Sequence, residues 1–231
     1  MTAVITGASS GLGKEYINAI IAQYPSVDVF WLVARRKELL KEIAGEHPDK
    51  TIAAISLDLS KEESLEMFEQ LLKENEPEIK VLVNNAGYGK ACDFFSSSRP
   101  AQTGMVDLNC RALTAITRLC LPYMLDDSLV LNVASVAAFA PAPRMTVYSA
   151  TKAYVLAFSK ALHEELRPRG IKVCAVCPGP MDTEFWDVAG VGEGKSRLID
   201  KLPKVSPTAV ATGSLRAAKR GKRSYTNSLF Y

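Results

Sequence analysis

The stretch TGASSGLG, residues 6–13, decides the fold, because it joins a short apolar run to a helical pattern. Residues 3–5 are apolar, and beyond the glycines Ile17, Ile20 and Ile21 recur at helical spacing. The sequence therefore predicts a strand, a glycine-rich turn and a helix. Glycines let the backbone approach a ligand, and a helix N-terminus attracts a pyrophosphate. A plain turn with capping serines is the alternative. The residues expected to hold a pyrophosphate are Gly7, Ser9, Ser10, Gly11, Leu12 and Gly13.

The second apolar run, residues 27–33, predicts a parallel strand covered on both faces. It ends in Ala34, Arg35 and Arg36. A site for NAD usually places an acidic residue near this strand end, whereas guanidinium groups suit a phosphate. We therefore expect NADP(H) rather than NAD, with Arg35 as the first candidate for its phosphate and Arg36 as the second. The alternative is that both arginines lie in solvent at the start of the next helix.

Two further predicted strands, residues 51–57 and 79–83, also end in polar residues. Asp58 is expected to contact an adenine amino group, or else to favour the start of a helix. The two asparagines of Asn84–Gly87 are expected to bind backbone across the sheet. Strands that alternate with helices predict a parallel sheet, in which ligands lie at the carboxyl ends of the strands. The residues expected to contact a cofactor here are Asp58, Leu59, Asn85, Ala86 and Gly87.

The middle of the chain predicts one long helix over Thr103–Met124, which contains Asn109. A fifth strand is expected over Leu129–Ala134 and is followed by Ser135. A sixth strand is expected over residues 171–177, before a Pro-Gly turn. Ser135 therefore stands at a strand end, as the candidate ligand positions of the first four strands do.

Tyr148 and Lys152 lie four residues apart in a predicted helix, so their side chains share one face. A nearby ammonium favours phenolate, so we expect Lys152 to lower the pKa of Tyr148 toward the working pH. Such a tyrosine can give a proton to a carbonyl oxygen or take one from an alcohol. Taken alone, the pair is better explained as a chance pairing on an ordinary surface helix.

Together these motifs resemble the classical short-chain dehydrogenase/reductase family, from residue 2 to about residue 183 and more loosely to the end. Ser135 precedes Tyr148 by thirteen residues (148 − 135), the usual interval in that family. The motifs are T-G-x-x-x-G-x-G at 6–13, N-N-A-G at 84–87, Asn109, Ser135, Y-x-x-x-K at 148–152 and P-G-x-x-x-T at 178–183. The resemblance implies a single α/β domain over residues 1–231, with a doubly wound, Rossmann-type parallel sheet flanked by helices.

The resemblance also implies roles for individual residues. Tyr148 resembles the catalytic acid and base, and Lys152 the residue that lowers its pKa and holds the nicotinamide ribose. Ser135 resembles the donor to the substrate carbonyl, and Asn109 the asparagine that keeps a water in the proton relay. The Ala34-Arg35 pair resembles the NADP-preferring branch. The residues expected near the nicotinamide carboxamide are Pro178, Gly179 and Thr183.

Composition excludes several other classes. A net charge of +3 is too small to indicate a nucleic-acid partner, and no apolar run is long enough to span a membrane. Five cysteines, an odd number, with only two histidines, predict free thiols in a reducing compartment and no metal site. We therefore expect a cytoplasmic protein. The family resemblance implies a homodimer or homotetramer that assembles through the helices of Asn109 and Tyr148.

The substrate is expected to contact residues 136–145 and a glycine-containing segment, residues 184–203, which we expect to act as a lid. Both are largely apolar, which favours a hydrophobic ketone or secondary alcohol, such as a steroid or a fatty-chain compound. The alternative is a non-catalytic sensor or scaffold that binds NADP(H). The last strand is expected at residues 224–226, in a tail whose shortness suggests a chain cut short relative to the family.

Overall fold

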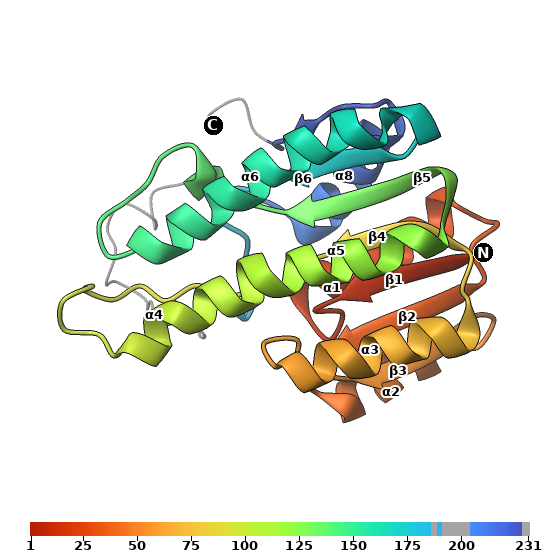
Figure 1. Ribbon diagram of the computed structural model, residues 1–231, viewed down its shortest axis with the longest axis horizontal. Helices are drawn as coiled ribbons and strands as arrows, with labels where there is room; N and C mark the ends of the chain where they lie inside the picture. The colour runs from red at the N-terminus through yellow and green to blue at the C-terminus, as the bar shows by residue number, and fades with distance from the viewer. Residues whose placement is uncertain (186–188, 191–203, 228–231) are drawn as a thin grey trace.

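The computed structural model describes residues 1–185, 189–190 and 204–227. In this part of the chain a sheet of strands lies between two layers of helices (Figure 1). The elements in chain order are β1 (Thr2–Thr6), α1 (Gly11–Gln23), β2 (Val29–Ala34), α2 (Lys37–Gly45), β3 (Thr51–Ser56), α3 (Glu62–Asn75), β4 (Ile79–Asn84), α4 (Arg99–Val106), α5 (Leu113–Cys120), β5 (Met124–Val133), α6 (Thr146–Leu166), β6 (Lys172–Val176), α8 (Pro207–Lys219) and β7 (Ser224–Tyr225).

The described strands form one parallel sheet in the order β3-β2-β1-β4-β5-β6-β7. The order reverses between β1 and β4, because the chain first builds outward from β1 to β3 and then returns to the other side. Ligands of such sheets bind outside the carboxyl ends of the strands at this reversal. The predicted doubly wound α/β fold is confirmed.

Each face of the sheet carries its own hydrophobic core. Ala3 and Ile5 of β1 pack with apolar residues of α1, α2 and α8, whereas Val4 packs with apolar residues of α3 and α5. This alternation follows from the two-residue period of a strand. Figure 1 shows α3, α5 and α6 on the near face. Because both faces are covered, β1 is buried along its whole length, which explains the apolar run of residues 3–5 at its centre.

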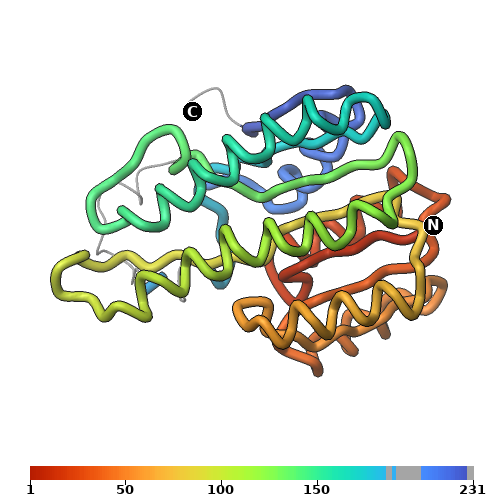
Figure 2. Tube along the Cα trace, viewed as in Figure 1, coloured from red at the N-terminus to blue at the C-terminus, as the bar shows by residue number. Residues whose placement is uncertain are grey.

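The helix expected over Thr103–Met124 differs from the prediction at its centre and at its end. The path is continuous in Figure 2, but a π-helical segment, Asp107–Ala112, separates α4 from α5. A short 3-10 turn, Leu121–Tyr123, then ends the helix. Pro122 within that turn has no N–H to continue the helix. Met124 is therefore the first residue of β5, a strand that starts earlier than expected.

The last strand, β7, lies where the sequence predicts it, within residues 224–226. Ser206 caps α8 by accepting a hydrogen bond from the amide of Ala209, and β7 pairs parallel to β6. Most of the expected lid, residues 184–203, falls outside the described residues. Within the described ranges, no helix is long and apolar enough to cross a membrane, and no group of histidine, cysteine and acidic residues could hold a metal ion.

Candidate active site

The glycine-rich turn after β1 is built for close backbone approach. Gly7 has a φ of +65°, and a Cβ there would lie 2.9 Å from the Cα of Ala86. A Cβ on Gly13 would lie 2.1 Å from the carbonyl oxygen of Gly7. Ser10 precedes α1 without capping it through its side chain, which leaves the first N–H groups of the helix available to an anion. These features fit the phosphates of a dinucleotide.

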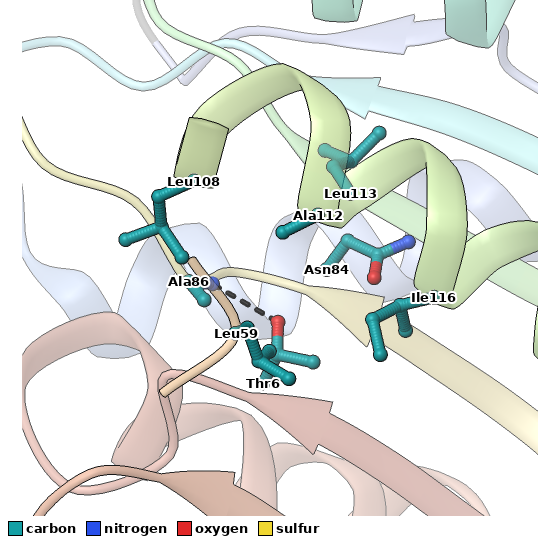
Figure 3. A pocket seen from close by; sticks show the side chains of 8 residues that line it. All are labelled: Thr6, Leu59, Asn84, Ala86, Leu108, Ala112, Leu113 and Ile116. Atoms are coloured by element: carbon teal, nitrogen blue, oxygen red, sulfur yellow. Dashed lines mark hydrogen bonds between the residues drawn. The ribbon is translucent and has the colours of Figure 1, made fainter. Parts of the chain in front are cut away.

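The turn is fixed to the end of β4 by Thr6. Its hydroxyl oxygen accepts hydrogen bonds of 3.0 Å from the amides of both Asn85 and Ala86 (Figure 3 shows the second). The side chain of Asn85 donates to the carbonyl oxygens of Thr6 and Gly7, at 3.2 and 3.1 Å. The side chains drawn in Figure 3 leave no volume between them that a water molecule could enter. Leu59, Ala86 and Leu108 of this packed layer also line the larger pocket described below.

The two asparagines at the end of β4 differ in function. Asn85 binds backbone of the neighbouring turn, as the sequence predicts. Asn84 instead donates to two buried side chains, the hydroxyl of Thr117 and the amide oxygen of Asn132, both at 2.9 Å. Asn132 in turn donates to Ser159, at 3.0 Å. The expectation that both asparagines bind backbone is therefore wrong for Asn84, which ties β4 to β5 and α5.

The end of β2 places both arginines at the rim of the pocket. Arg36 donates through Nε and Nη2 to the hydroxyl of Ser9, at 3.3 and 3.1 Å, and through Nη1 to Glu184, at 2.9 Å. Burial raises the pKa of Asp58, but two hydrogen bonds from Ser60 and the nearby charge of Arg35 lower it by more. The net result is a pKa below the ordinary value of an aspartate. Cations at this position favour a phosphate-bearing ligand.

Asn109 lies in the π-helical segment between α4 and α5. Its amide donates to the carbonyl oxygen of Tyr88, at 2.8 Å, and to the hydroxyl of Thr151, at 3.0 Å, while its oxygen accepts from the Tyr88 amide at 3.0 Å. These bonds fix the backbone just beyond Gly87 and connect it to the helix of Tyr148. In an ordinary helix a polar side chain faces water or bonds locally, but a π-helical bulge frequently marks a functional site.

Ser135, Tyr148 and Lys152 meet at the carboxyl end of β5. Tyr148 and Lys152 lie on α6, and both are almost fully buried, at 7% and 5% exposure. The Lys152 ammonium donates to the carbonyl oxygen of Val133 at 2.8 Å and lies 5.7 Å from the centre of the Tyr148 ring. The ring of Phe185 lies 5.5 Å from that of Tyr148, centre to centre.

The protonation of this group differs from the sequence expectation. Burial raises the pKa of Tyr148 to about 12, although a hydrogen bond with Ser135 lowers it in part. Burial also lowers the pKa of Lys152 to about 8, against the nearby thiols of Cys110 and Cys177, which raise it. The expected lowering of the Tyr148 pKa is therefore wrong for this structure, because loss of solvation outweighs the hydrogen bond with Ser135 and the net shift is upward.

A single pocket of about 1010 Å³ brings these elements together. It runs from the arginines after β2, across the glycine-rich turn, to Ser135, Tyr148 and Lys152. Gly13 and Asn109 are the two predicted site residues that do not line it; they act on its walls through Gly7 and Tyr88. The predicted residues in its lining are Gly7, Ser9, Ser10, Gly11, Leu12, Arg35, Arg36, Asp58, Leu59, Asn85, Ala86, Gly87, Ser135, Tyr148, Lys152, Pro178, Gly179 and Thr183.

The pocket also contains residues that sequence reasoning missed. Tyr88 and Lys90 line it just beyond the Asn84–Gly87 motif. Their position after a strand end was a signal, but their residue types indicate no particular chemistry. Glu184 lines it as well, and its sequence position inside the expected lid gave no indication of its bond to Arg36.

Comparison with known proteins agrees with this site. The family model for short chain dehydrogenases matches residues 1–191. The chain is 34% identical over 197 residues to the very-long-chain 3-oxoacyl-CoA reductase of Anas platyrhynchos, covering 81% of this chain and 62% of the relative.

Two solved structures are similar over almost the whole chain. One is a short-chain dehydrogenase from Sphingobium yanoikuyae in complex with NADPH, with a TM-score of 0.87, 30% identity, and coverage of 100% of this chain and 89% of that one. The other is the 3-ketoacyl-(acyl-carrier-protein) reductase of Brucella melitensis complexed with NADH, with a TM-score of 0.81, 26% identity, and coverage of 98% and 96%.

The fold and the site thus define a dinucleotide-binding oxidoreductase. More particularly, the chain belongs to the short-chain dehydrogenase family. Similar structures hold either NADPH or NADH, so membership alone does not decide between the two cofactors.

Proposed function

We propose that this chain is an NADP(H)-dependent oxidoreductase that interconverts a ketone and a secondary alcohol on a hydrophobic, steroid-like or fatty-chain substrate. The observation that carries the proposal is the grouping of Ser135, Tyr148 and Lys152 in the pocket that also contains the glycine-rich turn. A proton donor, a hydrogen-bond donor and a cation thus lie at one end of a site suited to a dinucleotide.

The pocket fits the cofactor at both ends. The positive φ of Gly7 and the open N-terminus of α1 suit the pyrophosphate. Arg35 and Arg36 suit the additional phosphate of NADP(H), and Asp58 and Leu59 would flank the adenine. Asn85, Ala86, Gly87, Pro178, Gly179 and Thr183 would line the path to the nicotinamide. When bound, the cofactor supplies or accepts a hydride.

The chain's own residues would handle the substrate oxygen. With its pKa raised to about 12, Tyr148 is a neutral phenol at physiological pH and is prepared to donate a proton. Ser135 bonds to Tyr148 and would be the second donor to the same oxygen. Two preorganised donors stabilise the negative charge that develops on a carbonyl oxygen during reduction. This arrangement favours reduction of a ketone at neutral pH.

The substrate end of the pocket is mostly apolar. Met145 and Phe185 pack around Tyr148, and several alanines complete the wall. Such a lining favours burial of a hydrophobic body and offers few partners to a strongly polar one. The relative from Anas platyrhynchos is itself named for a fatty-chain oxo compound, which supports the same substrate class.

The test is turnover of a panel of hydrophobic ketones, followed by the loss of reduced nicotinamide absorbance, with NADPH and NADH run in parallel. Turnover with NADPH and little with NADH is the expected result. Turnover with NADH alone would keep the oxidoreductase and reject the cofactor assignment. Cofactor binding without turnover of any ketone or alcohol would contradict the assignment of the chain as an enzyme and favour a non-catalytic NADP(H)-binding protein.

A further inference from the structure

An ion pair crosses the cofactor end of the pocket. Nη1 of Arg36, just beyond β2, lies 2.9 Å from Oε2 of Glu184, in the segment that follows β6. The same guanidinium donates twice to the hydroxyl of Ser9 in the glycine-rich turn. Three parts of the chain that are far apart in sequence therefore meet at one guanidinium, and all three residues line the pocket.

The position of Glu184 is set by its neighbours. Thr183 lies against the glycine-rich turn: a Cβ added to Gly11 would be 3.3 Å from its methyl group. Asp182, two residues before Glu184, faces elsewhere and pairs with Lys204 at 3.2 Å. The chain thus directs one acidic residue of this segment to the pocket and the other away from it.

The ion pair between Arg36 and Glu184 is weak enough for a bound phosphate to replace it. The side chains of Arg36 and Glu184 are 46% and 56% exposed. Ion pairs at such exposure contribute little to stability. A phosphate group carries more charge than a carboxylate. It also offers several acceptor oxygens to the planar guanidinium of Arg36. A phosphate that reaches Arg36 therefore competes with Glu184 for donors, and the two anions repel one another.

We infer that Glu184 is a specificity-determining residue. In the absence of cofactor its carboxylate binds Arg36 at the position that the adenosine phosphate of NADP(H) takes when it binds. The inference rests on the proposed use of NADP(H). Glu184 holds Arg36 on Ser9 while no phosphate is bound and gives up this contact when one binds. Its carboxylate therefore lowers the affinity for a phosphate-bearing adenosine and has little effect on an adenosine that lacks the phosphate.

The test uses fragments of the cofactor that lack the nicotinamide, so that binding is measured apart from turnover. Calorimetric titration of the full chain with adenosine 2′,5′-bisphosphate and with adenosine 5′-monophosphate isolates the contribution of the additional phosphate. Replacement Glu184→Gln should tighten bisphosphate binding about threefold and leave monophosphate binding unchanged. The control Asp182→Asn removes a charge from the same segment and should change neither affinity.

The same comparison in an Arg36→Gln protein tests whether Glu184 acts on the phosphate through Arg36. In an Arg36→Gln protein, the further change Glu184→Gln should tighten bisphosphate binding less than it does in the wild-type background, because competition for a shared donor is gone and only the repulsion between the two anions remains. Equal bisphosphate affinity in wild type and Glu184→Gln would overturn the inference, as would weaker binding in the variant. So would an Asp182→Asn effect as large as that of Glu184→Gln, which would indicate general electrostatics.

Failure of the proposed function gives a different result. If the wild-type chain binds the bisphosphate no better than the monophosphate, and neither Arg35→Gln nor Arg36→Gln alters this, the NADP(H) assignment itself fails. If the wild type prefers the bisphosphate and Arg36→Gln removes that preference, but Glu184→Gln has no effect, the cofactor assignment stands and only the role of Glu184 is rejected.

Discussion

The ammonium of Lys152 donates its hydrogen bond to the carbonyl oxygen of Val133, 2.8 Å away, while it lies 5.7 Å from the centre of the Tyr148 ring. The lysine is thus tied to the end of β5, and its cation faces the ring of Tyr148. Burial lowers the pKa of Lys152 to about 8 and raises that of Tyr148 to about 12. Both groups are consequently less charged than they would be in water.

The first prediction concerns the stability cost of the buried ammonium. The folded pKa of Lys152, about 8, lies below its value of 10.5 in the unfolded chain, so the unfolded chain binds more protons between these values. Stability therefore rises with pH across this interval, and the cost is full below pH 8. Replacement Lys152→Met should raise the free energy of unfolding at pH 7 by about 1–3 kcal/mol, after allowance for the unpaired Val133 carbonyl.

This prediction is checked by urea unfolding of wild type and Lys152→Met at pH 7 and at pH 10. The advantage of the variant should shrink at the higher pH, where the native lysine is largely neutral. A variant that is less stable than wild type at pH 7 would show that the buried ammonium does not carry this cost.

The pH dependence of reduction is the second prediction. If the positive charge of Lys152 is needed in the site, kcat/KM for ketone reduction should fall as the pH rises through about 8, because the free enzyme loses that charge. Tyr148 stays protonated well beyond this range, so it causes no fall in kcat/KM near neutral pH. Arginine does not titrate here, so Lys152→Arg should show lower activity without the limb near pH 8. A limb unchanged in that variant would assign it to another group.

A third prediction compares two glycines. Replacement Gly7→Ala places a Cβ 2.9 Å from the Ala86 backbone at a residue with a φ of +65°. It should destabilise the chain by about 2–4 kcal/mol and weaken cofactor binding. Gly45→Ala is the matched control, since a Cβ there meets nothing within 4 Å and the residue ends a helix. Thermal unfolding should show a loss in the first variant only; equal behaviour of the two would refute a tight turn at Gly7.

The fourth prediction assigns the cofactor preference. Replacement Arg35→Gln should weaken NADPH binding about tenfold, because it removes a charged donor to the additional phosphate, and should leave NADH binding nearly unchanged. Fluorescence titration with both cofactors measures this. The control Arg118→Gln removes a charge from α5 without touching the pocket lining. A similar loss for both cofactors would place Arg35 outside phosphate recognition.

The sequence carried the fold because each signal was local. The apolar run of β1, the glycine-rich turn and the polar strand ends could each be predicted without knowledge of distant contacts. Parallel topology then placed those strand ends on one edge. The shared helix face of Tyr148 and Lys152 and the place of Ser135 at a strand end are local features as well, but the roles of these three residues followed from the resemblance of the combined motifs to a known family.

What could not be predicted depended on contacts between segments far apart in the chain. Asn109 lies in a π-helical segment, and its side chain binds Tyr88 and Thr151, neither of which is near in sequence. The pKa of Tyr148 depends on burial, which a four-residue spacing does not reveal. The pairing of Arg36 with Glu184 spans 148 residues and has no local signature.

The most direct test of the central claim is the rate of ketone reduction by Tyr148→Phe, with NADPH binding measured on the same protein. The control is Tyr154→Phe, which removes a hydroxyl from the solvent side of the same helix, where it bonds Thr114. We predict that Tyr148→Phe binds NADPH as wild type does but lowers kcat by about a thousandfold, whereas Tyr154→Phe keeps normal activity. A Tyr148→Phe enzyme that retains more than about a tenth of the wild-type kcat would contradict the assignment of Tyr148 as the proton donor.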